Sequence, residues 1–290
     1  MAIILLTDST CDLPLSYIRD NNIDFLGLTV LMNDKEVLDD LGETLTYEDF
    51  YGYLRTGETT STSQVNTHSF TESFLKHVKN GDSIIYIGLS SALSGTYNSA
   101  SIAKEEVLEK YPAANISIIN TLSVSSGLGL LVHYASEMRK QGKSKEDIVN
   151  WIENNKLKVS HLFTVDDLEH LKRGGRLSGA SAFVGSLLNI KPLLFVNDAG
   201  ELLPYEKARG RKKAIRNLVD MLQKHIQSPE DQTIFISHGD CLEEAKQLEA
   251  LIRETVPLKD VIISMVGTTV GSHSGPGTLA LFFLSDIRKP

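Results

Sequence analysis

The sequence SIIYIGLSSALSGTY at positions 83–97 decides the predicted fold of this chain. Residues 83–87 form an apolar run typical of a buried strand, and residues 88–97 form a serine- and glycine-rich turn that leads into a helix-like segment. In an open α/β sheet, ligands bind beyond the carboxyl ends of the strands, where helix N-termini present free N–H groups. We therefore expect Ser94, Gly95 and Thr96 to hold an acidic ligand group. The turn contains no charged residue, so we expect neutral donors.

The strand–turn–helix pattern repeats on both sides of this stretch. It predicts strands at 2–6, 25–31, 83–87 and 116–119, with helices at 46–55, 97–110, 125–141 and after Ser144. Such alternation predicts a parallel sheet covered on both faces. The pattern changes near residue 158. From there we expect strands at 159–164, 191–196, 233–236 and 261–265, and helices at 166–173, 178–188, 212–227 and 242–254.

Size and composition limit the function classes. A chain of 290 residues predicts two domains, and a formal net charge of −8 argues against nucleic acid as the main partner. The two cysteines, Cys11 and Cys241, are far apart and indicate neither a zinc site nor a disulfide framework. The N-terminus lacks a secretory signal pattern, and no apolar run is long enough for stable membrane insertion. We expect a cytoplasmic protein.

Three further segments are candidates for the ligand crevice. Asp8 and Ser9 follow the first strand, where they are candidates for contact with a ligand, and the alternative is that Ser9 or Asp12 only caps the next helix. Residues 59–64 are all hydroxyl or amide residues, which is typical of a mobile loop but also fits a second wall of the crevice. Residues 267–277 contain four glycines and a proline around His273, which predicts a loop that brings its backbone against a ligand.

Known sequence motifs of nucleotide-binding proteins and hydrolases limit the possible functions further. No nucleotide-binding P-loop and no strand-linked GxGxxG occurs, so we expect no ATP or NAD site in this chain. Ser94 does not lie in a GxSxG sequence, which is the motif of a nucleophile elbow. The chain nevertheless contains the residue types of a catalytic triad in Ser94, His273 and Asp8. A hydrolase or acyl transferase that uses Ser94 and His273 is therefore the alternative function. The turn at His238 and Asp240 is interpreted as helix capping, and we expect no metal site.

A basic cluster contrasts with the acidic chain. It comprises Lys172, Arg173, Arg176, Lys207, Arg209, Arg211, Lys212, Lys213 and Arg216. A solvated helix face explains such a cluster, and so does a docking surface for an acidic or phosphate-bearing partner.

Several segments together resemble the DegV family of fatty-acid-binding proteins, which includes the FakB subunits of bacterial fatty acid kinase. They span the whole chain: Thr7-Asp8-Ser9, Thr62-Ser63-Gln64, residues 89–96, Gly174-Gly175-Arg176, Lys191-Pro192-Leu193 and residues 271–277. Two departures from the family pattern are Val65, where proline is common, and Asn120, where aspartate is common.

The resemblance implies an N-terminal three-layer α/β/α domain with a parallel sheet (1–158) and a C-terminal two-layer α/β domain with a mixed sheet (159–290). One long-chain fatty acid lies between them, with its acyl chain in an apolar tunnel. Its carboxylate is held by Thr62 and Ser94, with His273 in the same hydrogen-bond network, so that no other cofactor is needed.

The remaining implied roles concern the surroundings of that carboxylate. Ser63, Gln64, Gly95, Thr96, Asp8 and Ser9 support the pocket. A separate ATP-dependent kinase subunit receives the carboxylate and makes an acyl-phosphate, with Arg173, Arg176 and Arg209 as candidate contacts. This chain is then a carrier subunit with no catalytic residue of its own. A lipid-sensing regulator that binds another macromolecule through the basic cluster is a further alternative.

Overall fold

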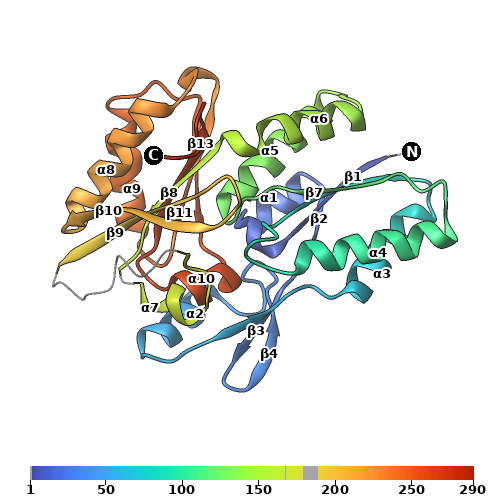
Figure 1. Ribbon diagram of the computed structural model, residues 1–290, viewed down its shortest axis with the longest axis horizontal. Coiled ribbons are helices and arrows are strands. Elements are labelled where there is room, and N and C mark those ends of the chain that lie inside the picture. The colour runs from blue at the N-terminus through green and yellow to red at the C-terminus, as the bar shows by residue number, and fades with distance from the viewer. Residues whose placement is uncertain (1, 167, 179–188) are drawn as a thin grey trace.

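The computed structural model describes residues 2–166, 168–178 and 189–290. The chain forms two α/β halves that lie side by side (Figure 1). All strands of the first large sheet precede residue 121, and all strands of the second follow residue 158. The predicted two-domain α/β fold is therefore confirmed.

The first half contains a parallel sheet in the strand order β2-β1-β6-β7. Its strands are β1 (Ile3–Asp8), β2 (Ile23–Leu26), β6 (Ser83–Gly88) and β7 (Ile116–Asn120). Helices α3 (Thr67–Val78) and α4 (Thr96–Lys110) cover one face, and α5 (Ser126–Lys140) and α6 (Lys145–Asn155) cover the other (Figure 1). Because both faces are covered, the central strands are almost continuously apolar.

Local signals explain where several helices begin. Helix α1 (Leu15–Asp20) follows Pro14, and the Thr46 hydroxyl at the start of α2 (Tyr47–Arg55) accepts the Asp49 N–H at 3.1 Å. Ser144 and Asp147 form a reciprocal capping box at α6. These side chains satisfy N–H groups that have no partner within the helix.

The second half contains a mixed sheet in the order β10-β9-β8-β13-β11-β12. Among the described strand pairs of this sheet β11–β12 is parallel and the others are antiparallel. Helices α8 (Arg211–His225) and α9 (Leu242–Arg253) cover the outer face (Figure 1). The strands are β8 (Val159–Thr164), β9 (Ile190–Val196), β10 (Leu202–Arg209), β11 (Thr233–His238), β12 (Asp260–Met265) and β13 (Leu279–Leu284). This is the predicted two-layer arrangement with a mixed sheet.

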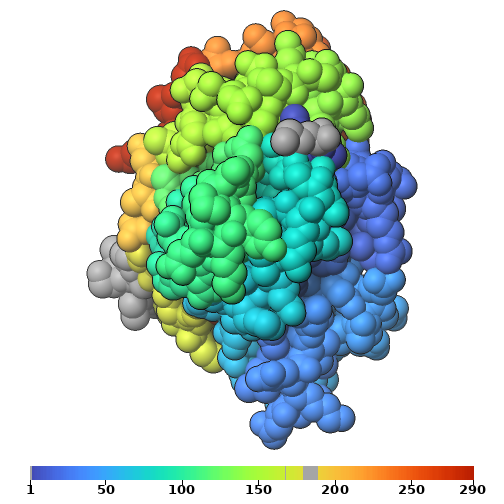
Figure 2. Space-filling model, turned by 90° about the vertical axis from the view of Figure 1, so that its right-hand side faces the viewer, coloured from blue at the N-terminus to red at the C-terminus, as the bar shows by residue number. Residues whose placement is uncertain are grey.

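The prediction of one strand over residues 25–31 is wrong. The chain leaves the main sheet after Leu26 and forms β3 (Thr29–Met32), which pairs with β4 (Lys35–Leu38) and with β5 (Ser61–Ser63) in a small antiparallel sheet. The β3–β4 hairpin projects from the lower end of the molecule (Figure 2). Residues 61–63 are thus a strand and do not form a mobile loop, because β3 supplies their backbone hydrogen-bond partners.

Four described elements after residue 158 depart from the prediction. Residues 268–274 form helix α10 (Thr268–Ser274), where a loop was expected. Strands β10 and β13 were not predicted, although β13 lies at the centre of its sheet. Helix α7 (Glu169–Arg173) is shorter than expected, and the predicted helix at 178–188 falls almost wholly outside the described residues. Short 3-10 turns complete the chain at Ser9–Cys11, Lys156–Lys158 and Pro229–Asp231.

Candidate functional site

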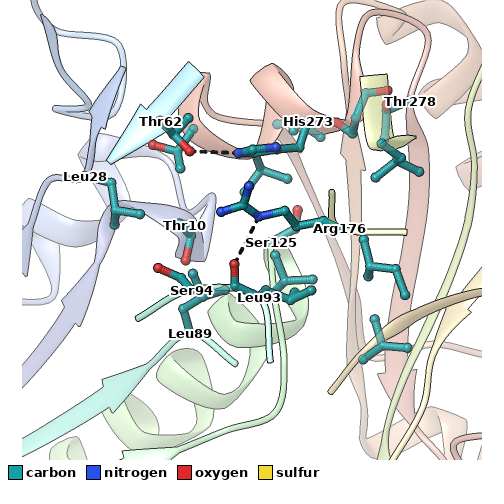
Figure 3. Close-up of a pocket in the computed structure, with 18 of the residues that line it drawn as sticks. Thr10, Leu28, Thr62, Leu89, Leu93, Ser94, Ser125, Arg176, His273 and Thr278 are labelled. Atoms are coloured by element: carbon teal, nitrogen blue, oxygen red, sulfur yellow. Dashed lines mark hydrogen bonds between the residues drawn. The ribbon is translucent and has the colours of Figure 1, made fainter. Parts of the chain in front are cut away.

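A cavity of about 360 Å³ lies between the two halves. Its apolar lining includes Leu89, Leu93 and Val124 from the first half, with Phe163 and Phe282 from the second. Thr62, Ser94, Arg176 and His273 lie near one another in the lining (Figure 3), and we call the part around them the polar end of the cavity. Hydroxyl groups of other residues, such as Thr10, Ser125 and Thr278, line other parts. The cavity therefore combines apolar side chains with several hydrogen-bonding groups.

Ser94 and Thr96 form the turn between β6 and α4. Their hydroxyl groups bond to each other at 2.9 Å, and the Ser94 oxygen accepts the Thr96 N–H at 3.3 Å. Ser94 and Gly95 line the cavity, whereas Thr96 is fully buried behind them. A Cβ at position 95 would overlap the end of the Gln64 side chain, so any other residue here would have to displace that amide.

Thr62 and His273 connect the two halves at the cavity. The Thr62 hydroxyl and His273 Nε2 are 2.8 Å apart, although 211 residues separate them in sequence (Figure 3). Burial, with a smaller contribution from the positive charge of Arg176, lowers the pKa of His273 to about 4. The imidazole is therefore neutral at physiological pH. Within the described chain, its Nδ1 atom has no hydrogen-bond partner.

Arg176 reaches into the cavity from the segment after α7. Its Nε donates to the Leu93 carbonyl at 3.2 Å, and Nη1 donates to the Gly174 carbonyl (Figure 3). A positive side chain therefore lines the cavity beside the neutral donors of the turn. The sequence predicts Arg176 only as a candidate kinase contact, because a single arginine after two glycines gives no sign of the direction of its side chain.

The other residues predicted to support the pocket divide into two groups. Ser63 and Gln64 line the cavity, and the Gln64 amide donates to the Ser99 hydroxyl at 2.8 Å. Asp8 and Ser9 are completely buried behind it. Their contacts hold lining segments in place.

Asp8 and Ser9 each accept backbone hydrogen bonds from the cavity wall. Asp8 accepts the Leu89 N–H at 3.1 Å and the Tyr86 hydroxyl at 2.8 Å, and the Ser9 oxygen accepts the Leu28 N–H at 3.1 Å. Burial raises the pKa of Asp8, and these hydrogen bonds offset part of that effect. Asp8 also caps the 3-10 turn that follows β1, whereas the sequence had suggested Ser9 or Asp12 as the capping residue.

The contacts of Ser94 and His273 do not form a nucleophile–base pair. In the part of the chain that the structure describes, the Ser94 hydroxyl bonds to Thr96, the His273 ring bonds to Thr62, and Asp8 bonds to Thr10, Tyr86 and Leu89. A Ser–His–Asp mechanism requires these three side chains to be joined in sequence. The geometry therefore does not support the hydrolase alternative. Nor do the described residues contain a cluster of three or more potential metal ligands.

An open cleft of about 590 Å³ adjoins the cavity. Thr62, Arg176 and His273 belong to both linings, and Arg173 lines the cleft on the outer side. Arg209 is the last residue of β10 and lines neither space. The polar end of the cavity is thus the part that faces an opening.

Comparisons with known proteins place this geometry in a family. A family model described as an uncharacterised protein of the DegV family matches residues 2–286. A DegV domain-containing protein of Clostridium perfringens is 52% identical over 287 residues, which are 99% of each chain.

Solved structures share the fold over nearly the whole length. A DegV lipid binding protein from Thermotoga maritima matches with a TM-score of 0.86 and 32% identity, covering 100% of both chains. A fatty-acid-binding DegV family protein from Thermus thermophilus matches with a TM-score of 0.89 and 28% identity, covering 98% of this chain and 100% of that one. No helix among the described residues is long and apolar enough to cross a membrane. On the evidence of the family match, the sequence identity and the shared fold, this chain belongs to the DegV family.

Proposed function

We propose that this protein binds one long-chain fatty acid in the cavity and presents its carboxylate to a separate ATP-dependent kinase subunit. The observation that carries the proposal is the apolar cavity with a polar end at Thr62, Ser94, Arg176 and His273 that adjoins an open cleft. The fatty acid or lipid binding of the structural neighbours supports the choice of ligand.

The hydrogen-bond pattern of His273 supports Thr62 as a carboxylate donor. A buried N–H without a partner is costly, and Nδ1 has no partner within the described chain, so the proton belongs on Nε2. Nε2–H then donates to the Thr62 oxygen at 2.8 Å. This arrangement leaves the hydroxyl proton of Thr62 free to donate to a ligand oxygen.

Arg176 adds a positive charge beside the proposed carboxylate. Its Nε–H and one N–H of Nη1 already donate to the carbonyl groups of Leu93 and Gly174. Pairing of a carboxylate through Nε is therefore not available, and the other N–H groups of Nη1 and Nη2 remain as donors.

The acyl chain supplies most of the binding free energy in this proposal. Burial of each methylene is worth about 0.8 kcal/mol, so about fifteen methylenes contribute about 12 kcal/mol before the cost of ordering the ligand. The polar end then has to fix only the orientation of the head group.

The proposed reaction needs no base from this chain. A carboxylic acid is already ionised at neutral pH, so the carboxylate oxygen attacks the γ-phosphorus of ATP directly, an O–P bond forms, and the bond to the leaving ADP breaks. We propose that the kinase approaches through the open cleft, where Arg173 lies beside the shared residues. Arg209 remains a candidate contact only for a partner that also covers the end of β10.

The ligand is tested by extraction of the protein after expression in bacteria. Mass spectrometry is expected to find long-chain fatty acid at close to one molecule per chain. Lipid-free protein that also fails to bind added oleate or palmitate would refute the proposal.

The polar end is tested with the double variant Thr62→Ala, Ser94→Ala. It is expected to lower kinase-coupled acyl-phosphate formation at least tenfold, because each lost hydrogen bond to a charged group is worth about 1.5–3 kcal/mol. Ser101→Ala, on helix α4 and outside the linings of both the cavity and the cleft, is the control and is expected to retain wild-type turnover. Unchanged turnover in the double variant would exclude both residues from the site.

A further inference from the structure

Helix α10 belongs to the second half of the chain but also packs against the first half. Its neighbours there are β3, β5, α2 and the 3-10 turn after β1, and within its own half it packs against α7. The packing is close, because a side chain at Gly271 would come within 2.7 Å of the Tyr51 hydroxyl, and that hydroxyl donates to the Val266 carbonyl at 2.8 Å. His273 is carried near the C-terminal end of this helix.

Two buried carboxylates of the first half hold the N-terminal end of α10. Asp39 accepts the Thr269 N–H at 3.1 Å and the Thr269 hydroxyl at 2.6 Å. Asp12 accepts the N–H of Gly267, the residue before the helix, at 2.9 Å. The first N–H groups of a helix have no partner within the helix, and negative charge is favourable there. Both aspartates are at most 2% exposed.

We infer that Asp39 and Asp12 are positioning residues that set the location of His273 against Thr62. The helix is only seven residues long, so the carboxylates and the imidazole hold opposite ends of one short rigid element. A displacement of its N-terminus moves His273 by a similar amount, and the 2.8 Å contact with Thr62 tolerates little displacement. The consequence of this positioning for a bound fatty acid rests on the proposed function.

Burial of the two carboxylates is consistent with a positioning role. Desolvation raises the pKa of both Asp12 and Asp39, and the nearby charge of Asp39 adds to the rise at Asp12. Burial of an ionised carboxylate costs free energy, so ionisation of these two side chains contributes little to the stability of the fold. What they contribute is the hydrogen bonds that they accept across the boundary between the two halves.

The test measures His273 directly and does not depend on a kinase. The pKa of His273 is measured by NMR titration. The substitution Asp39→Ala is expected to raise this pKa toward the usual histidine value near 6.5, because the imidazole becomes less buried. Asp39→Asn keeps an acceptor for the Thr269 N–H and is expected to retain most of the lowered pKa. Asp240→Asn is the matched control, since Asp240 also crosses between the halves through its ion pair with Arg55 at 2.8 Å but does not touch α10.

A second measurement reports on the ligand itself. When oleate labelled with ¹³C at its carboxyl carbon binds to the Asp39→Ala variant, the NMR chemical shift of that carbon is expected to differ from its value in the wild type. In kinase-coupled phosphorylation of the bound oleate, the variant is expected to have a kcat about 10- to 100-fold lower, with a smaller change in KM. An unchanged His273 pKa in Asp39→Ala overturns the positioning role. Failure of wild-type protein to bind oleate refutes the proposed function but leaves the His273 measurement valid.

Discussion

The neutral, buried imidazole of His273 leads to a specific dependence of stability on pH. We consider the variant His273→Gln, which keeps a polar side chain of similar length but cannot titrate. The protein is studied without bound fatty acid, so that a ligand carboxylate does not affect the imidazole. All other histidines are common to the wild type and the variant, and their contributions cancel in the difference between the two.

The magnitude follows from the two pKa values of the histidine. The pKa of His273 is about 4 in the folded protein, and that of an unperturbed histidine is about 6.5. Above pH 6.5 the imidazole is neutral in both states and the pKa difference has no effect. As the pH falls from about 6.5 to about 4, the unfolded chain takes up a proton that the folded protein does not, and stability is lost. Each pKa unit corresponds to 1.36 kcal/mol, so the total loss is about 3 kcal/mol.

Urea unfolding at a series of pH values between 7.5 and 4 measures this effect. The free energy of unfolding of the wild type is expected to fall by about 3 kcal/mol more than that of His273→Gln across this range. The substitution His68→Gln serves as a control. The His68 side chain is 79% exposed, so its replacement is expected to leave the wild-type pH profile of stability unchanged. Parallel profiles for the wild type and His273→Gln would refute the burial argument.

Three other substitutions test separate contacts of the site. Arg176→Gln removes a positive charge that lowers the pKa of His273, so NMR titration is expected to show that pKa rising, and an unchanged value would contradict the contact between them. Asp39→Ala leaves the buried N–H and hydroxyl of Thr269 unpaired, which is expected to lower the free energy of unfolding by about 1–3 kcal/mol in urea, whereas an unchanged value would show that α10 is held by its packing alone. Gly95→Ala is expected to displace Gln64 and weaken oleate binding in calorimetry, and wild-type affinity would show that the turn can shift without cost.

The sequence predicted the elements whose signals are local. Apolar runs such as residues 83–87 and 116–119 are strands, and Thr46 and Ser144 begin helices, because the deciding interactions lie within a few residues. The repeated order of strand, turn and helix also predicted the parallel sheet. These signals, together with the motifs shared with the DegV family, were sufficient for the fold class.

Segments whose structure depends on distant partners were predicted less well. Strand β10 exists because β9 pairs with it, and residues 268–274, within the glycine-containing stretch 267–277, form a helix because Asp12 and Asp39 accept hydrogen bonds from N–H groups at its start. Neither partner is visible in the local sequence. The division of residues 25–31 between two sheets has the same origin, since β4 and β5 provide the pairing for β3.

The sequence by itself determined the α/β class, the family and the residue types available for a carboxylate site, because these depend on local patterns and motifs. Only the tertiary structure decided that Thr62 and His273 are in contact and that Arg176 reaches the same cavity. These facts depend on how the two halves pack and on where each side chain points after packing. A pattern of residues along the chain does not contain those directions, whereas the hydrogen bonds and burial between the halves do.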